Sequence, residues 1–463
     1  MHECIECVLS RELCVIQWLL IVDVALLAGM EHAGIGPTHV NNFLTAMDIP
    51  AVDPKLLRRQ ERSIGPVIEQ VASESCRAAA EEEAKKSGNG GLTMSYDCGW
   101  QKRGRAMNSL TGVGHAIGEE TGKIIGYATR SKRCTTCSNA ERKKTTPKPH
   151  DCRKNFDKSS KAMEADAIGE IAESLQSSGF SIAQLVGDDD SSAIKRLRET
   201  AGKDVEKASD LNHVKKNLGN ALYELKSGGH KELSAKVIKY VQKMFMYAIT
   251  QNAGNPDGLR SALSAVVPHM YGQHDSCGDW CSYKKNPSTY RHKSLPYGKD
   301  LANATTRSAL AKLFEGYADK AENLAHQGSS QVNESFNNTV ANKQPKSRHY
   351  GSSASFNYRV GAAVAQKNIG YTYLDDVLKK AGLSPSKHAK VHGKRLDKLR
   401  QRKSVRQATK EVKRHRLDLK EARSSSLAAS EVREGTQYQS GCALLPSQDT
   451  VEIASPVCYE AIE

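Results

Sequence analysis

The sequence lacks a hydrophobic run that could cross a membrane. Its longest apolar stretch, Val15 to Ala28, is interrupted by polar residues and is shorter than the roughly 20 apolar residues that a spanning helix needs. A basic secretory leader is also missing, because Glu3, Glu6 and Glu12 lie where such a leader would be positively charged. We therefore expect neither a membrane-spanning nor a secreted protein, and no membrane partner.

Apolar residues are few but sufficient for a folded core. They make up 38% of the 463 residues, a composition that argues against collagen-like, coiled-coil and wholly disordered chains. The length exceeds one ordinary domain and predicts two or three folded units with tails. Among the 12 cysteines, close pairs such as Cys4/Cys7 are typical of metal sites or reduced thiols rather than of a secreted disulfide framework.

Positive charge is concentrated toward the carboxyl end of the chain. Residues 387–423 hold 15 Lys and Arg against 4 Asp and Glu, which is +11 of the formal net charge of +15. Such a segment can neutralise nucleic-acid phosphates, and a solvated helix face or a nuclear-import signal is the alternative. The candidate DNA-contacting residues are Lys102, Arg103, Lys394, Arg395, Arg400, Arg402 and Lys403.

The first 90 residues have a helical pattern. An apolar helix is expected to end at Gly29, a short helix to cover His39–Met47, and a longer amphipathic helix to begin near Pro54. Short helices around tight turns are typical of a helix-turn-helix, but a small helical bundle gives the same pattern.

Beyond a Gly-rich linker at residues 87–91, the hydrophobic periodicity changes. We expect three strands in a meander, then helix, strand, helix, strand, helix, which is the order of a ribonuclease-H-like α/β fold. Residues 130–157 are expected to form an irregular loop, and residues 228–327 again have a helical pattern. The expected strands are Leu92–Asp97, Leu110–Ile117, Lys123–Thr129, one within Phe180–Gly187 and one around Val205–Ala208, and the expected helices are Ser160–Ser177, Ser191–Thr200, Asn212–Leu225 and Gln331–Asn342.

Acidic residues follow two of these strands. Asp97 and Asp188 are each expected to end a strand at the sheet edge where α/β proteins bind ligands. Paired carboxylates there suit Mg²⁺, which binds one or two carboxylates together with substrate phosphates. The alternative is that such residues only cap the next helix, as Asp190 can.

A third acid, Glu334, lies on an expected helix. Val332, Phe336 and Val340 are expected to share one face of that helix, and Glu334 lies on another part of its surface. From there the Glu334 carboxylate could point into a polar cleft. The alternative is that Glu334 is an ordinary surface residue.

Two groups of cysteine and histidine have metal-ligand spacing. Cys134-Thr-Thr-Cys137 and His150-Asp-Cys152 supply four ligands in zinc-ribbon spacing, with free thiols in a loop as the alternative. We expect structural Zn²⁺ there. A second group contains Cys277 and Cys281 with His274 and His292 nearby, and this group indicates either a metal site or buried reduced thiols.

Five short motifs occur in order along the chain: Ser95–Gly104, Ser159–Glu164, Val186–Ser192, Asp210–Asn217 and Gln331–Asn337. Together they resemble the acidic motifs, the helix segment and the Cys/Asp-x-x-His element of Mutator-like transposases, in the subgroup common in invertebrate genomes. The resemblance extends from about Ile16 to Gly441. One departure is Asp189, where the family more often has Gly.

The resemblance implies a DDE transposase, a metal-dependent polynucleotidyl transferase and nuclease. Asp97, Asp188 and Glu334 would be its catalytic triad and would hold two Mg²⁺ or Mn²⁺ ions, with Asp190 in reserve for the second position. Water would attack the phosphodiester at a transposon end, and the freed 3′-hydroxyl would then attack target DNA.

Asp210 and His213 match the family's supporting element. Because they are three residues apart at an expected helix start, they could also simply cap and orient that helix.

The resemblance further implies a ribonuclease-H-like core with an all-α insertion, which fits the 146 residues between Asp188 and Glu334. DNA would be the partner, the nucleus the location, and a homo-oligomer is one expectation. The alternatives are a catalytically inactive DNA-binding protein derived from such an enzyme, or a ribonuclease or Holliday-junction nuclease on the same fold. The expected regions are an N-terminal helical region at 1–90, the core at 91–226 with its Cys/His insertion at 130–157, the helical insertion at 227–327, the helix of the third acid at 328–345, a C-terminal region with the basic helical tail at 346–423, and a disordered tail at 424–463.

Overall fold

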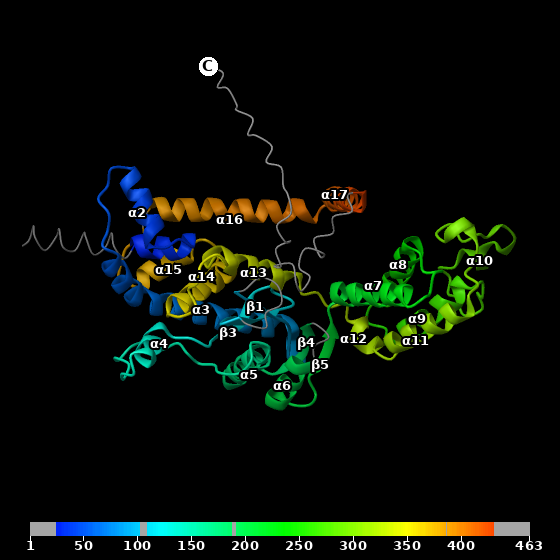
Figure 1. Ribbon diagram of the computed structural model, residues 1–463, viewed down its shortest axis with the longest axis horizontal. Coiled ribbons are helices and arrows are strands. Elements are labelled where there is room, and N and C mark those ends of the chain that lie inside the picture. Colours follow the sequence, from blue (N-terminus) through cyan, green and yellow to red (C-terminus); the bar gives the residue numbers. More distant parts are fainter. Residues whose placement is uncertain (1–24, 102–108, 188–190, 386, 430–463) are drawn as a thin grey trace, which may run out of the picture. The chain divides into compact units, whose positions relative to one another are not determined.

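The computed structural model describes residues 25–101, 109–187, 191–385 and 387–429 (Figure 1). The chain divides into two compact units, residues 1–394 and 395–463, and each is described by itself. Within the described ranges, no helix combines the length and the apolar character needed to span a bilayer.

The first unit is built on a five-stranded mixed sheet with the strand order β3-β2-β1-β4-β5. The first three strands form the predicted antiparallel meander, and β4 and β5 run parallel to β1. Gly122, with φ of +63°, lies in the turn between β2 and β3, because glycine adopts this backbone conformation at no steric cost. The strands are β1 (Leu92–Trp100), β2 (Thr111–Gly118), β3 (Ile124–Ser131), β4 (Ile182–Gly187) and β5 (Glu206–Ser209).

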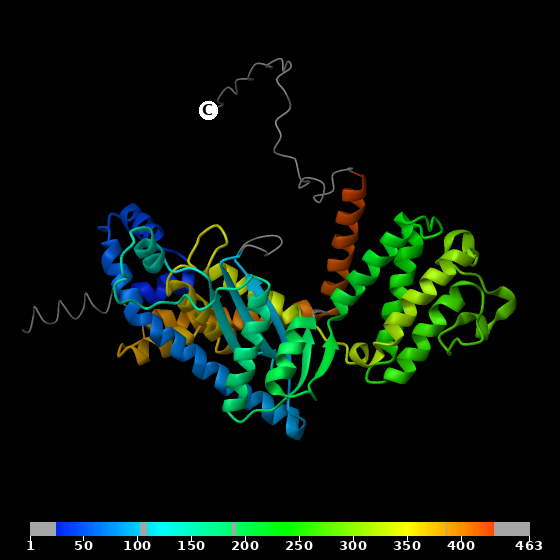
Figure 2. The ribbon, with the colours of Figure 1, turned by 60° about the horizontal axis from the view of Figure 1, so that its bottom comes forward.

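Side chains of β1 alternate between two differently covered faces. Met94 and Tyr96 pack in a hydrophobic cluster with residues of α5 (Ala162–Ser177) and α6 (Ser191–Ala201). Ser95 points to the opposite face, where it contacts α13 (Gln331–Lys343). Figure 2 shows α5 and α6 in front of the sheet. The sheet is therefore a central layer between helices.

The face opposite α5 is covered by helices that come from both ends of the unit. Residues 25–33 form a helix, which continues past Gly29, where the sequence had predicted its end. It is followed by α2 (Pro37–Ala46) and α3 (Pro54–Ser87), both as predicted, and α3 begins at an Asp53 cap. The helix α14 (Ser355–Asn368), which the sequence did not predict, packs on α3 and is almost wholly buried.

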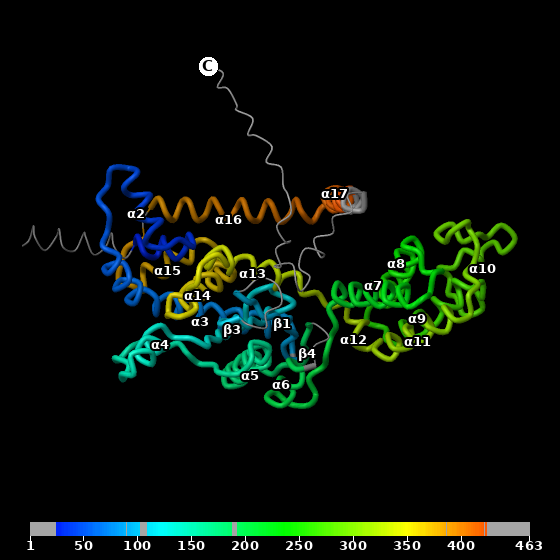
Figure 3. The backbone as a smooth tube through the Cα atoms, in the orientation of Figure 1, coloured from blue at the N-terminus to red at the C-terminus, as the bar shows by residue number. Residues whose placement is uncertain are grey.

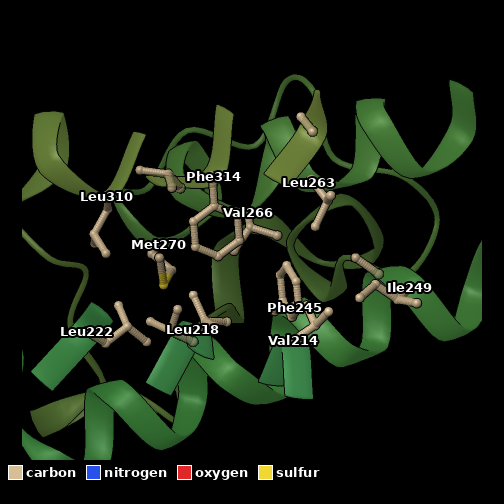
Figure 4. Close-up of a cluster of buried hydrophobic side chains, with 14 of the residues drawn as sticks. Val214, Leu218, Leu222, Phe245, Ile249, Leu263, Val266, Met270, Leu310 and Phe314 are labelled. Carbon is tan, nitrogen blue, oxygen red and sulfur yellow. The ribbon is translucent and has the colours of Figure 1, made fainter. Parts of the chain in front are cut away.

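A second, all-helical region lies between β5 and α13 in the sequence (Figure 3). All but the shortest of its helices share one hydrophobic cluster, in which the rings of Phe245 and Phe314 meet edge to face at 6.0 Å (Figure 4). The helices are α7 (Leu211–Ser227), α8 (Ala235–Gln251), α9 (Pro256–Met270), α10 (Ser282–Lys285), α11 (Ala304–Ala318) and α12 (Ala321–Ala325), with 3-10 turns at Pro287–Thr289 and Pro296–Gly298.

The predicted irregular loop at residues 130–157 is only partly irregular. It contains α4 (Thr135–Arg142), a short helix whose start lies between the first two cysteines of the segment, so the prediction was wrong there. Only Ala140 of α4 is buried, which leaves no apolar stripe from which a helix could be predicted. The remaining elements are a 3-10 turn at Gly88–Gly90, α15 (Tyr373–Lys380), α16 (Lys387–Ala408) and α17 (Lys410–Ala429).

Candidate active site

The sequence had predicted Asp97 at the end of a strand. In the structure it lies inside β1. The strand continues to Trp100 because β2 pairs with it over its whole outer half, with Asp97 opposite His115. On the other side, the last residue pair between β1 and β4 is Ser95 with Val186. Asp97 therefore sits just beyond the end of the β1–β4 pairing, at the carboxyl edge of the parallel strands.

The Asp97 carboxylate is half-buried, and among the described residues one hydrogen-bond donor contacts each of its oxygens. Oδ1 accepts a hydrogen bond from the Cys98 backbone N–H at 2.8 Å, and Oδ2 accepts one from the Asn337 side-chain amide at 2.7 Å. Because each carboxylate oxygen can accept two hydrogen bonds, lone pairs remain for a further ligand. The side chain is thus oriented without being saturated.

The helix α13 lies along β1 in a matched register. The fully buried Asn333 accepts a hydrogen bond from the Ser95 hydroxyl at 2.7 Å and donates one to the Ser95 carbonyl at 3.3 Å. Four residues later, Asn337 contacts Asp97. Four helical residues advance about 6 Å and two strand residues about 6.6 Å. The two asparagines therefore fit two successive same-face positions of the strand.

Glu334 lies on α13 one turn before Asn337 and is exposed. Positions three apart share a helix face, so Glu334 lies on the same side of α13 as Asn337, the residue that contacts Asp97. The predicted face of Val332, Phe336 and Val340 was wrong at its first member: Val332 is 37% exposed, and Asn333 is buried in its place. The reason is that Asn333 finds hydrogen-bond partners on Ser95, which offset the cost of burying an amide.

Asp210 fastens the start of α13 to the start of α7. Its Oδ1 accepts from the Asn212 backbone N–H at 2.7 Å and caps α7, which confirms the capping interpretation for Asp210. Its Oδ2 accepts from the Ser330 backbone N–H at 3.1 Å and from the Ser330 hydroxyl, just before the first residue of α13. The partially buried His213 lies in the first turn of α7.

The far end of α13 is fastened by buried charges. The Lys343 ammonium donates to the His32 carbonyl at 2.9 Å, and Arg359 donates to the Lys343 carbonyl at 2.8 Å. Arg359 also pairs with the buried Glu31 at 3.2 Å. Burial lowers the pKa of Lys343 to about 7 even though Glu31 opposes the shift. The helix that carries Glu334 is thus held at both ends.

The second predicted acid, Asp188, and its reserve Asp190 lie outside the described residues. The structure shows that β4 ends at Gly187, parallel to β1. Sequence reasoning overlooked Glu164 as a site residue. It lines a small pocket with Asp97 and Gly187, and its backbone carbonyl accepts from the Tyr96 hydroxyl at 2.7 Å. Glu164 is the last residue of the Ser159–Glu164 motif, and nothing in that short motif indicated that it lies near Asp97.

His115 is a second residue that sequence reasoning missed. It is fully buried opposite Asp97 on β2, and its ring meets Phe336 of α13 edge to face at 4.7 Å. Burial lowers the pKa of His115, although the neighbouring Asp97 carboxylate raises it in part. The sequence did contain one indication that His115 belongs to the site: it is a histidine within an otherwise apolar strand.

The four predicted zinc-ribbon residues meet at one point. The Cys134 and Cys137 sulfurs lie 3.2 and 3.4 Å from His150 Nε2, and the Cys137 sulfur lies 3.6 Å from that of Cys152. All four candidate ligand atoms are within 4.8 Å of one another. Burial raises the pKa of Cys134, but hydrogen bonds from the backbone of Cys137 and Thr136 outweigh it and bring the pKa to about 7. Three sulfurs and one imidazole form a donor set that fits zinc.

The model of the Mutator-like transposase family matches residues 20–281, more than half of the chain. The chain belongs to this family. The matched part of this Mutator-like sequence contains Asp97 and the cluster at residues 134–152, whereas Glu334 lies beyond it. A search of curated proteins returned no match.

The predicted DNA-contacting residues of this family member fall into two groups. Lys102 and Arg103 lie outside the described residues. The others are on α16, where their side chains are exposed: Lys394, Arg395, Arg400, Arg402 and Lys403.

Proposed function

We propose that this protein is a DDE transposase that cuts DNA and transfers the resulting 3′-hydroxyl end to target DNA. The observation that carries the proposal is the hydrogen bond from Asn337 to Asp97, because it brings the helix of Glu334 beside the strand of the first acid. Family membership supports the transposase class. The strand order and the helical region between β5 and α13 agree with a ribonuclease-H-like core that carries an insertion.

In this proposal Asp97, Asp188 and Glu334 hold two Mg²⁺ or Mn²⁺ ions. The donor chemistry fits, because hard divalent cations prefer carboxylate oxygens and the Asp97 oxygens keep free lone pairs. When bound, the ions supply an activated water and stabilise charge on the leaving oxygen. Asn337 fixes the orientation of the Asp97 carboxylate. The contacts at both ends of α13 fix the position of the helix backbone from which the Glu334 side chain extends.

The cluster of Cys134, Cys137, His150 and Cys152 is proposed to bind a structural Zn²⁺. Four protein ligands leave no open position for substrate, which is the pattern of structural rather than catalytic zinc. The ion would connect α4 to the irregular segment between α4 and α5, which contains His150 and Cys152.

DNA contact is proposed for the exposed basic helices α16 and α17. Their net positive charge suits phosphates in any sequence context, so they would supply affinity rather than base recognition. A DNA substrate in turn implies action in the nucleus.

A nicking assay on DNA that carries the transposon ends tests the proposed function. Asp97→Asn, Asp188→Asn and Glu334→Gln should each lower Mg²⁺-dependent cleavage on the order of 10³-fold or more while DNA binding persists. Glu322→Gln is the matched control, because this glutamate is 79% exposed and lies on α12, outside the strand of Asp97 and the helix of Glu334. Full activity in any of the three variants would remove that residue from the site. A wild-type chain that binds the ends but never nicks them would favour the inactive, DNA-binding alternative.

A further inference from the structure

The segment between α9 and α11 is ordered around a cluster of polar side chains. It contains only one short helix and two 3-10 turns, so regular backbone hydrogen bonding does little to define its shape. Yet His269, His274, Cys277 and Cys281 are each at most 6% exposed. The sequence had placed His292 in this group, and the structure replaces it by His269, from the last turn of α9.

The four side chains converge through particular atoms. The Cys277 sulfur lies 3.4 Å from His269 Nδ1 and 3.9 Å from His274 Nδ1. The Cys281 sulfur lies 3.6 and 3.5 Å from the same two nitrogens. The two nitrogens are 3.1 Å apart, and all four atoms lie within 4.8 Å of one another.

These separations are those of a tetrahedral zinc site. With Zn–S of about 2.3 Å and Zn–N of about 2.0–2.1 Å, tetrahedral geometry puts sulfur about 3.6 Å from nitrogen and the two nitrogens about 3.3 Å apart. The four sulfur–nitrogen distances lie on both sides of the first value, and the nitrogen–nitrogen distance is close to the second. Both cysteines are free thiols, so no disulfide explains their approach.

We propose that His269, His274, Cys277 and Cys281 bind a second, structural Zn²⁺ within the helical region. Two thiolates and two imidazoles favour zinc over magnesium or calcium, which prefer oxygen ligands. Because the set is closed and buried, it offers no position to substrate and takes no part in DNA cleavage.

Neighbouring side chains orient the imidazoles, as metal-bound histidines require. His269 directs its other nitrogen, Nε2, toward the hydroxyls of Tyr240 and Tyr290, each at 3.4 Å. The ring of His274 stacks on Tyr283 at 4.1 Å. His292 donates to the His269 backbone carbonyl at 2.9 Å, so it supports a ligand residue instead of binding the metal itself.

The zinc would fasten the segment onto the hydrophobic cluster of the helical region. Leu295 and Leu301, which follow the two cysteines in the chain, are buried in that cluster beside residues of α9 and α11. A metal bound by His269 at the end of α9 and by the two cysteines would leave fewer unconstrained residues in the segment between α9 and α11. Removal of the ion should therefore expose residues 271–303 to proteases before the rest of the chain.

Zinc content of the purified full-length chain tests the proposal. Elemental analysis should find two zinc ions per wild-type chain and one in each of Cys281→Ser and His269→Ala. Cys76→Ala is the matched control, since Cys76 is a buried free thiol outside both clusters, and it should retain both ions. His292→Gln should also retain both. Unchanged zinc content in Cys281→Ser and His269→Ala would overturn the proposal, as would zinc loss in His292→Gln together with retention in His269→Ala.

A second measurement does not require any ligand of the proposed site to be changed. Cys152→Ser removes an exposed ligand of the first cluster and should leave one zinc per chain. X-ray absorption of that remaining zinc should show two sulfur and two nitrogen neighbours. Three or more sulfur neighbours, or no remaining zinc in a folded chain, would contradict the second site. Neither readout depends on cleavage activity, so the proposal can fail while the proposed function stands.

Discussion

The sheet face that carries Asp97 and the helical region between β5 and α13 are stabilised in different ways. On the sheet face, α13 is fixed by polar contacts: Asn333 with Ser95, and Asn337 with Asp97. In the helical region the cluster around Phe245 is aliphatic and aromatic throughout. The register of α13 on β1 thus depends on directional hydrogen bonds in addition to apolar packing, whereas the helices around Phe245 are held together by burial of apolar surface.

The two kinds of contact have different consequences: apolar packing mainly contributes stability, and paired polar groups mainly fix atomic positions. An apolar core tolerates many side-chain arrangements with small losses, so it stabilises a region without defining any single atom's position. Buried polar groups cost about 1–3 kcal/mol when left unpaired, so they permit essentially one register of α13 on β1. A site that must place carboxylates accurately benefits from the second kind of contact.

Phe245→Ala should have the largest effect on stability and the smallest on chemistry. Phe245 is fully buried, and its loss should lower the free energy of unfolding by about 3–5 kcal/mol. Urea unfolding measures this, while nicking by the folded fraction should stay near the wild-type rate. A variant that remained stable but could not nick DNA would break the comparison from the helical side.

Asn337→Ala should do the reverse. It removes the amide that holds Asp97 Oδ2, and the misplaced carboxylate should slow nicking about a hundredfold, with a raised Mn²⁺ requirement. The adjacent, exposed Asn338→Ala is the matched control and should nick normally. If both variants cleaved at the wild-type rate, the contact between α13 and β1 would have no part in positioning the first acid.

The smallest expected effect lies where the two regions meet, at the hydrogen bond of 2.8 Å between His326 and Glu119. Glu119 raises the pKa of His326 above its usual 6.5. The pair therefore stabilises the fold fully below pH 6.5, and this contribution is lost as pH rises through the raised pKa. Because both groups are about one-third exposed, the contribution should stay below about 1 kcal/mol.

Urea unfolding of wild type and His326→Gln, compared from pH 5.5 to pH 9, measures this contribution. The difference between the two proteins should shrink as pH rises. A difference that stays constant, or grows toward alkaline pH, would show that the pair does not link the two regions electrostatically.

Local features of the sequence were the predictable part of the fold. Strands β1 to β3 follow from alternating apolar residues and a Gly122 turn, and α13 follows from helical spacing. The first Cys/His cluster was predictable because its four members lie within 19 residues of sequence. Each of these signals is contained in a short window.

Features that depend on distant partners were not predictable. The rotation of α13 that buries Asn333 and exposes Val332 depends on Ser95, more than 200 residues away. The choice of His269 over His292 depends on how the segment after α9 folds back. No spacing rule in the sequence encodes either contact.

The most direct test of the central claim is a crystal structure of the chain soaked with Mn²⁺ and measured for anomalous scattering. The account predicts Mn²⁺ signal between Asp97, Asp188 and Glu334, with Asn337 still bonded to Asp97. Signal elsewhere only, or a Glu334 side chain that points away from Asp97 in the metal-loaded crystal, would contradict it.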